Sequence, residues 1–344
     1  MTFLRNAWYP AAWSAALGDA PMELTMLDQF IVLFRGEGGQ PKALHDACPH
    51  RFAPLSRGKS RNGRIVCGYH GLEFDGAGRC VHNPHGHGAT VSALRVRAFP
   101  VAERYGMLWI WMGAEGGEES HPLPDLPLFD DPGLTWVHGQ LDVRVHYELV
   151  TDNLLDLTHV EFLHPFLASP GNAARTHYRC EQMGDEVRSV YTIREEPVTG
   201  LFQLLWPDAP ERANMVADIV WQAPARLSLK TSMGRGESAA GDDPQLVVMH
   251  LLVPQGENAT RYFWAAGRNS AKDSEQVSAM LHQGTQNAFE FEDEPMIAAV
   301  RSRMRSNDLM AHKPAILPFD EGAIRARRIL ARMLGRELAE QATG

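Results

Sequence analysis

Two short segments of the sequence each carry one cysteine and one histidine. The segment Cys48-Pro49-His50 is followed, after sixteen residues, by Cys67-Gly68-Tyr69-His70. Cysteine thiolates and histidine imidazoles bind iron and zinc, so these side chains can form one metal centre. A zinc site of the finger type usually takes both cysteines from one loop and both histidines from the other. Here each loop supplies one of each kind, which favours a centre with two unlike metal positions.

A Rieske [2Fe–2S] centre has two unlike positions, because two cysteines hold one iron and two histidines hold the other. Two loops of this composition can place both sulfurs on one side of the cluster and both imidazoles on the other. Gly68 and Gly71 suit tight loops, and Pro49 stiffens the first of them. We therefore predict a Rieske cluster, with a Cys₂His₂ zinc site as the alternative; the predicted ligands are Cys48, His50, Cys67 and His70.

A second group of metal-binding residue types falls on a predicted short helix, Asp152 to Leu163. Asp152, Asp156 and His159 recur at i, i+4 and i+7, which aligns them on one stripe of a leucine-rich helix. His159 and His164 straddle the expected helix end before a proline. Two histidines and one carboxylate form the facial triad of Fe(II) oxygenases, which leaves positions open for O₂ and substrate. Such a pair alone is also typical of core or surface histidines, but the cluster motif in the same chain favours the iron site.

The carboxylate that would complete this triad is expected far along the chain. The stretch Glu290-Phe291-Glu292-Asp293-Glu294 on a later predicted helix is rich in acids. Asp293, Glu290 and Glu292 are the candidates there, and the remaining acids would form a solvated helix face. Residue types alone do not choose among the three.

Four segments together resemble one protein family. They are RNAWYPAAW near the start, CPHRFAPLSRG and CGYHGLEFDGAGRCVHNPHGHG around the predicted cluster, and TDNLLDLTHVEFLH around the two histidines. They resemble the α subunits of Rieske non-heme iron oxygenases, in the monooxygenase branch that includes vanillate and dicamba O-demethylases and toluenesulfonate methyl-monooxygenase. The resemblance covers nearly the whole chain, and its motifs are specific for the family but not for the substrate.

The resemblance assigns roles to individual residues. It implies that Asp293 is the third iron ligand, with Glu290 and Glu292 as the alternatives. It implies that Asp156 accepts hydrogen bonds from the iron-bound His159 and from a cluster histidine of a neighbouring subunit, and so carries the electron connection. It also implies that Asn153 lies next to the iron; the alternative is a residue that satisfies backbone donors at a helix start.

The family also implies an activity. Single electrons pass from the cluster to a mononuclear Fe(II), O₂ is activated, and one oxygen atom is inserted into an aromatic substrate. Hydroxylation of a methoxy group gives a hemiacetal that collapses to a phenol and formaldehyde. The glycine pattern at Gly234 to Ala239 is followed by Gly241-Asp-Asp-Pro244 instead of a helix, so we expect no nucleotide site. Electrons from NAD(P)H would then arrive through a separate reductase or ferredoxin, and a homotrimer is the implied assembly.

His250 is a candidate substrate residue. In the predicted strand Leu246 to Val253 it shares a face with Val248 and Leu252, so an imidazole lies among apolar side chains. A buried polar group needs a partner, and in a ligand cavity this partner can be a carboxylate or sulfonate of the substrate. The resemblance supports this role modestly, and a satisfied core histidine is the alternative.

Basic residues cluster between the two cluster loops. They are Arg57, Lys59, Arg61 and Arg64. Such a patch could steer an acidic redox partner, although a solvated hairpin is the simpler interpretation. Cys80 and Cys180 belong to neither loop and are expected to be structural thiols, and the histidines of His82 to His87 are expected to be solvated in a loop.

The sequence pattern divides the chain into two domains of an α+β protein. Residues 1–115 show short apolar runs between turns, which predict an all-β Rieske domain. A stretch rich in Gly, Pro and acid, residues 113–133, marks the boundary. Residues 116–344 are predicted to form a catalytic domain with an antiparallel sheet and segregated helices. Predicted elements there include a strand over Leu141 to Val150, a helix from about residue 271 to Met304 interrupted at Pro295, and a last helix over Glu321 to Ala339.

Composition narrows the classes of function. The chain has 344 residues, 44% of them hydrophobic, and a formal charge of −9, which argues against a nucleic-acid partner. Four cysteines, no signal peptide and no long apolar run favour a cytoplasmic protein without a membrane segment. The rival function is a Rieske electron carrier without catalysis of its own, which would hold two irons per chain instead of three and would leave His159, His164 and Asp293 without a purpose.

Overall fold

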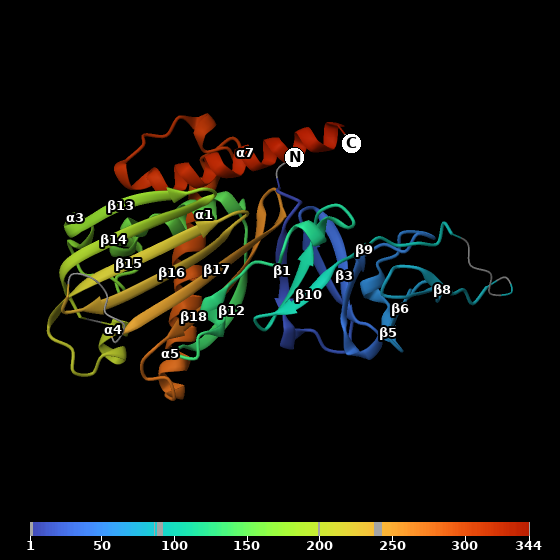
Figure 1. Ribbon diagram of the computed structural model, residues 1–344, viewed down its shortest axis with the longest axis horizontal. Coiled ribbons are helices and arrows are strands. Elements are labelled where there is room, and N and C mark those ends of the chain that lie inside the picture. Colours follow the sequence, from blue (N-terminus) through green and yellow to red (C-terminus); the bar gives the residue numbers. More distant parts are fainter. Residues whose placement is uncertain (1–2, 86, 88–91, 199, 237–242, 344) are drawn as a thin grey trace. The chain divides into compact units, whose positions relative to one another are not determined.

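The computed structural model describes residues 3–85, 87, 92–198, 200–236 and 243–343 (Figure 1). It divides into two compact units, Phe3–Pro127 and Leu128–Gly344. The first is all-β and the second combines a large antiparallel sheet with helices, so the predicted fold class is confirmed. Among the described residues, no helix is both long and apolar enough to span a membrane.

The first unit extends further than the boundary after residue 115 that the sequence suggested. The Trp8 indole N–H donates to the His121 carbonyl at 2.8 Å. The Tyr105 hydroxyl donates to Asp125 at 3.1 Å and accepts from the backbone N–H of Leu126 at 3.0 Å. These bonds tie the Pro-rich segment to the first unit, because a short segment without regular structure must satisfy its backbone polar groups on a neighbour.

The first unit contains three small antiparallel sheets. Their strand orders are β1-β11-β10, β2-β3-β4-β9 and β5-β6-β7-β8. The strand bounds are Trp8–Trp13 (β1), Met22–Met26 (β2), Gln29–Arg35 (β3), Pro41–His45 (β4), Lys59–Arg61 (β5), Arg64–Val66 (β6), Glu73–Phe74 (β7), Cys80–His82 (β8), Ala98–Phe99 (β9), Val101–Arg104 (β10) and Met107–Trp111 (β11). All of β11 is buried, which explains its unbroken apolar sequence. Thus β4 and β6, which precede the two Cys/His loops, belong to separate sheets.

The second unit is built on a seven-stranded antiparallel sheet. Its order is β12-β18-β17-β16-β15-β14-β13. The bounds are Thr135–Val143 (β12), Thr176–Met183 (β13), Glu186–Pro197 (β14), Arg212–Gln222 (β15), Arg226–Gly234 (β16), Gln245–Gly256 (β17) and Ala259–Arg268 (β18). The helices are Tyr147–Leu155 (α1), Val160–Leu163 (α2), Asn172–Arg175 (α3), Gly200–Leu205 (α4), Glu275–Asn287 (α5), Glu294–Ser302 (α6) and Glu321–Thr343 (α7).

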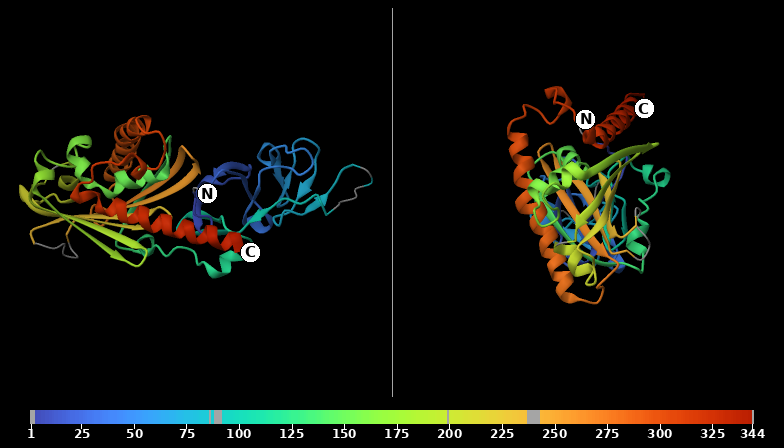
Figure 2. Two further views of the ribbon diagram at one scale, coloured as in Figure 1. Left: turned by 90° about the horizontal axis from the view of Figure 1, so that it is seen from above. Right: turned by 90° about the vertical axis from the view of Figure 1, so that its left-hand side faces the viewer.

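One face of this sheet carries the main helices. The Tyr191 hydroxyl donates to the last carbonyl of α1 at 2.6 Å, and Trp264 donates to Gln286 of α5 at 2.9 Å. The Tyr178 hydroxyl accepts from Gly322 of α7 at 3.0 Å. The strand registers place all three aromatic residues on the same face. Helices α5 and α6 are joined by a π-helical segment, Ala288–Asp293, into one rod (Figure 2).

Two predicted elements differ from the structure. The expected strand Leu141 to Val150 ends at Val143, and α1 begins at Tyr147 after His146, whose Nδ1 accepts from the backbone of Glu148. The expected helix Asp152 to Leu163 is interrupted at Asp156, whose backbone is extended (φ −108°, ψ 98°). The Asp156 carboxylate accepts from the backbone N–H of Thr158 at 2.8 Å and caps the next turn, Leu157–His159. The prediction that Asp152, Asp156 and His159 align on one continuous helix was therefore wrong.

Asp152 has a different role from the one its spacing suggested. Its carboxylate accepts three hydrogen bonds from Arg327 of α7, at 2.9 Å and 3.1 Å from Nε and at 2.7 Å from Nη2. The same guanidinium donates to Glu148 at 2.7 Å. Burial raises the pKa of Asp152, and the charge and hydrogen bonds of Arg327 oppose this rise. The last helix is thus fixed to α1 by a largely buried cation between two carboxylates.

We expect Arg327→Met to destabilise the second unit by about 3–5 kcal/mol, because two carboxylates would remain in a buried position without their cation. Urea unfolding followed by tryptophan fluorescence measures this change. The matched control is Arg332→Met on the same helix, since Arg332 pairs with Asp185 at an exposed site. That change should cost no more than about 1 kcal/mol. Equal losses in the two variants would contradict the anchoring role of Arg327.

Candidate metal centres

The two Cys/His loops of the first unit have the same backbone hydrogen bonds. The N–H of Cys48 donates to the carbonyl of Ala53 at 2.9 Å, and its carbonyl accepts from Phe52 at 2.8 Å. The N–H of Cys67 donates to Leu72 at 2.8 Å, and its carbonyl accepts from Gly71 at 3.0 Å. Phe52 (φ 57°) and Gly71 (φ 73°) both take the left-handed conformation that these turns require.

The four predicted cluster residues lie together. Cys48 and Cys67 are buried in the core of the unit, and their thiols hydrogen-bond to each other. The rings of His50 and His70 are 4.5 Å apart between centroids, on the more exposed side of the loops. Burial raises the pKa of the Cys48 thiol to about 11. Two sulfurs toward the core and two imidazoles toward the surface are the donor set and the order that a Rieske cluster requires.

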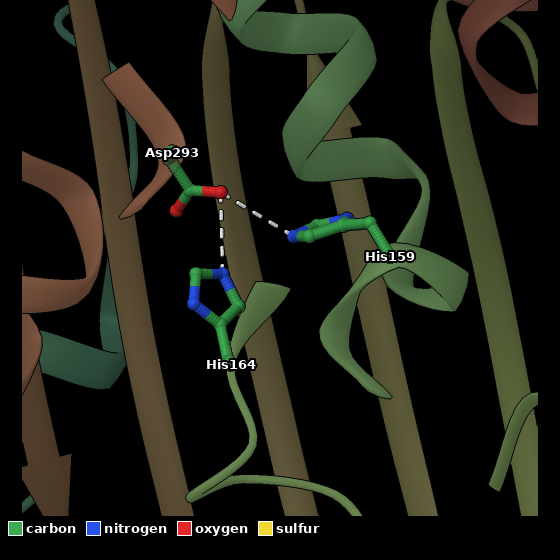
Figure 3. A group of neighbouring side chains, drawn as sticks. All are labelled: His159, His164 and Asp293. Carbon is green, nitrogen blue, oxygen red and sulfur yellow. Dashed lines mark hydrogen bonds and ion pairs between the residues drawn. The ribbon is translucent and has the colours of Figure 1, made fainter. Parts of the chain in front are cut away.

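In the second unit, His159, His164 and Asp293 meet at one point. One ligand atom from each lies within 4.8 Å of the others. The Nε2 atoms of His164 and His159 are 3.2 Å and 3.5 Å from the same carboxylate oxygen, Oδ1 of Asp293 (Figure 3). His164 and Asp293 are buried, and His159 is half-buried. The set of two imidazoles and one carboxylate fits a mononuclear iron.

The charge of this group suits a bound cation. Burial alone raises the pKa of Asp293, but hydrogen bonds from His159 and His164, together with their charge, outweigh it and bring the pKa to about 2. The carboxylate is therefore ionised at neutral pH. Asn153 of α1 adds a hydrogen bond from its amide nitrogen to Asp293 Oδ1 at 3.2 Å. The structure thus places Asn153 beside the triad and not at a helix start.

The local backbone explains how three distant residues converge. The extended backbone of Asp156 separates α1 from the turn Leu157–His159, so His159 is presented from a separate turn and not from α1. Asp293 ends the π-helical segment and is its buried residue. A π-helical turn takes one more residue than an α-helical turn, and such turns often occur at functional sites. His159 and Asp293 thus lie in a short 3₁₀ turn and a π-helical segment, and His164 directly follows α2.

Each histidine has a second contact that directs its Nε2 inward. The Nδ1 of His159 contacts the backbone carbonyl oxygen of Asp156, not the carboxylate that the sequence analysis assigned to this histidine. The Nδ1 of His164 lies 2.5 Å from Oε2 of Glu292. Glu292, an alternative ligand in the sequence analysis, therefore lies on the far side of His164. No local pattern in the sequence predicts this contact, because Glu292 lies in the π-helical segment, 128 residues after His164.

The other candidate residues are not members of either ligand group. Glu290 pairs with Gln286 on the same helix at 2.9 Å. His250 is buried on β17, and its Nδ1 is 2.5 Å from the Tyr262 hydroxyl. The Cys80 thiol contacts the carbonyl of His82, and Cys180 is half-buried on β13. In the histidine-rich loop, of which residue 86 lies outside the described part, the His85 ring contacts the carbonyl of His70 at 2.9 Å.

Comparison with known families matches both units. Residues 7–100 match the Rieske [2Fe-2S] domain, and residues 143–336 match the vanillate O-demethylase oxygenase C-terminal domain. The second match covers more than half of the chain. Fold and site therefore define a Rieske-type oxygenase with a catalytic domain, which excludes a simple electron carrier. The chain belongs to the family of vanillate O-demethylase oxygenase components.

Individual relatives support the same assignment. The oxygenase component of dicamba O-demethylase from Stenotrophomonas maltophilia is 34% identical over 97% of this chain and 98% of its own length. The vanillate O-demethylase oxygenase subunit of Pseudomonas sp. (strain HR199 / DSM 7063) is 28% identical over 97% of this chain and 96% of its own. The crystal structure of dicamba monooxygenase with 3,6-dichlorosalicylic acid superposes with a TM-score of 0.92, at 33% identity, covering 98% of this chain and 100% of that one. The chain is thus an oxygenase component with a [2Fe–2S] cluster and a mononuclear non-heme iron, uses O₂ and takes electrons from a separate reductase or ferredoxin.

We expect Glu292→Ala to weaken binding of the mononuclear iron about 10- to 100-fold, because His164 would lose the carboxylate that fixes its ring. Titration of iron-depleted protein with Fe(II) under argon measures this affinity. Glu290→Ala is the matched control. Glu290 lies two residues before Glu292, and within the described part of the chain its carboxylate hydrogen-bonds to Gln286 and not to a metal-site histidine. Unchanged iron affinity in Glu292→Ala would show that the contact does not support the site.

Proposed function

We propose that this oxygenase component hydroxylates a methyl or methoxy carbon of an aromatic acid, with loss of formaldehyde in the methoxy case. The observation that carries the proposal is the convergence of two imidazole Nε2 atoms on one buried carboxylate oxygen. The kinship with O-demethylase oxygenase components supports the choice of reaction.

In this proposal, the residues divide into three groups. Cys48 and Cys67 hold one iron of the cluster, and His50 and His70 hold the other. His159, His164 and Asp293 hold the mononuclear iron, which supplies open coordination positions for O₂ and substrate.

Neighbouring side chains then orient these ligands. Asn153 donates to the Asp293 carboxylate and keeps it facing the two imidazoles. Glu292 and the carbonyl of Asp156 hold the Nδ1 sides of His164 and His159, so that both rings present Nε2 to the metal. Burial of His164 and Asp293 keeps bulk water away from the reacting carbon.

We further propose that His250 contacts a carboxylate or sulfonate of the substrate. It lies on the helix-covered face of the sheet, and its ring centroid is 5.6 Å from that of Phe289, four residues before Asp293. Burial lowers the pKa of His250 to about 3, so the imidazole is neutral. A neutral imidazole can donate a hydrogen bond to an anionic oxygen without forming an ion pair.

A homotrimer belongs to the same proposal. Exposed aromatic side chains lie near both centres: Phe52 (78% exposed) and Tyr69 (60%) on the cluster loops, and Phe162 (77%) and Phe166 (81%) around His164. Exposed aromatic groups of this kind are typical of protein interfaces. We propose that the cluster loops of one subunit contact the iron site of the next beside the half-buried Asp156, whose backbone carbonyl contacts the His159 ring.

The redox partner would approach the basic hairpin of the first unit. Arg61 and Arg64 both pair with the buried carboxylate of Glu73, which lowers the free positive charge. Arg57 and Lys59 are exposed and form no ion pair within the described part of the chain. We propose that these two side chains contribute most to the attraction of an acidic reductase or ferredoxin.

We expect oxygen uptake and formaldehyde release when the protein, its reductase and a methoxylated benzoate are combined. A panel of methoxylated, methylated and sulfonated benzoates identifies the preferred class. Asp293→Ala should lose the mononuclear iron and turnover while the EPR spectrum of the reduced cluster stays unchanged. Consumption of every panel member without an oxygenated product would reject the proposed reaction.

We expect mixed trimers to show whether electrons cross between subunits. A His70→Ala chain lacks a working cluster, and an Asp293→Ala chain lacks the mononuclear iron, so each is inactive alone. When the two chains are produced together, an intact iron site beside a neighbour's intact cluster should restore turnover. The control is a mixture of the two variants, each purified separately as its own trimer, under conditions in which subunits do not exchange. No activity in the co-assembled trimers would place electron transfer within one subunit.

A further inference from the structure

His250 forms a hydrogen-bonded pair with Tyr262 on the helix-covered face of the sheet. The residue opposite His250 on β18 is Trp264, so Tyr262 is its diagonal neighbour. Both side chains are buried, and the Tyr262 hydroxyl lies 2.5 Å from Nδ1 of His250. The pair lies between the sheet and the π-helical segment that carries Asp293.

The protons of this pair can be assigned. A tyrosine hydroxyl keeps its proton at neutral pH, and a buried hydroxyl must donate it to an acceptor. Burial raises the pKa of Tyr262 further above its ordinary value. Among the described residues, Nδ1 of His250 is the acceptor that the hydroxyl reaches. Nδ1 is therefore unprotonated, and the neutral ring carries its single proton on Nε2.

The described residues offer no acceptor to the resulting Nε2–H donor. Nε2 is buried and has no hydrogen-bond partner in the described part of the chain. The nearest aromatic neighbour is Phe289, whose ring centroid is 4.9 Å from that of Tyr262 and 5.6 Å from that of His250. An unmatched buried donor costs stability, so it is retained where a ligand supplies the acceptor.

We propose that Tyr262 is a positioning residue, which fixes His250 in the Nε2–H tautomer so that the site recognises an acceptor oxygen of the substrate through a neutral, oriented donor. This inference rests on the substrate role proposed for His250. Without the tyrosine hydroxyl, the ring can move its proton to Nδ1 and present a lone pair to the substrate oxygen, which would repel it. Tyr262 thus acts on binding through His250 and not on the iron.

The tautomer is measured directly by ¹⁵N NMR of histidine-labelled protein at pH 7.5, with the cluster oxidised and Zn²⁺ in place of the mononuclear iron. The spectrum of His250→Gln identifies the His250 signals. We expect the wild type to show an unprotonated Nδ1 and a protonated Nε2, and Tyr262→Phe to show a tautomer mixture. A protonated Nδ1 in the wild type would overturn the inference, whether or not a substrate is known.

Kinetics with the best acid of the benzoate panel test the consequence. Tyr262→Phe should raise KM about five- to tenfold and leave kcat within about twofold, since only binding loses an oriented hydrogen bond. Tyr178→Phe removes another partly buried hydroxyl, which contacts Ser189 and Gly322, and should change neither constant. An unchanged KM in Tyr262→Phe would overturn the positioning role. Failure of every substrate with the wild type would instead reject the proposed reaction and leave the tautomer result standing.

A double-mutant cycle separates action through His250 from a direct contact. The amide nitrogen of glutamine can stand in for Nε2–H without help from a tyrosine, so His250→Gln should retain part of the binding. In that background, Tyr262→Phe should have no further effect on KM. Equal effects of Tyr262→Phe in both backgrounds would show that Tyr262 touches the substrate itself.

Discussion

The second metal centre depends on one shared atom, the Oδ1 of Asp293 that faces the Nε2 atoms of both His159 and His164. A buried carboxylate is unfavourable unless donors or cations surround it. Here two imidazoles and the amide of Asn153 supply that surrounding, and they come from segments 129 to 140 residues away in the sequence. The chain interruption at Asp156, the π-helical turn and the position of α1 on the sheet together bring these groups to one oxygen.

The two metal centres use opposite environments. In the first unit, the cysteines are buried and the histidines lie toward the surface, so that the imidazole side is open to a partner. In the second unit, His164 and Asp293 are buried and His159 is half-buried, and the nearby carboxylates of α1 are paired, as Asp152 and Glu148 are with Arg327. An exposed edge suits a group that only passes electrons. A closed site suits a group that must control which carbon meets activated oxygen.

Sequence reasoning could single out the candidate ligands, which lie together in the structure, but not all of their contacts. The Rieske motif is recognisable from residue types and their order alone, without coordinates; it consists of Cys48, His50, Cys67 and His70. The contact between Glu292 and His164 was not predictable, because an α-helical turn at the same place would send that carboxylate elsewhere. The prediction that Asp152 shares a helix face with Asp156 and His159 was wrong for a similar reason. Neither the helix interruption nor the pairing with Arg327, 175 residues later, can be read from the local sequence.

The charges around the iron site explain why a neutral histidine would suit substrate binding nearby. The site holds two carboxylates, Asp293 and Glu292, around two imidazoles. A divalent cation bound there would balance these two negative charges and leave little net attraction for an anionic substrate. Substrate recognition must then rest on oriented hydrogen bonds. In the role that we propose for it, the neutral His250, held by Tyr262, would provide such a bond without placing a further cation in a buried site.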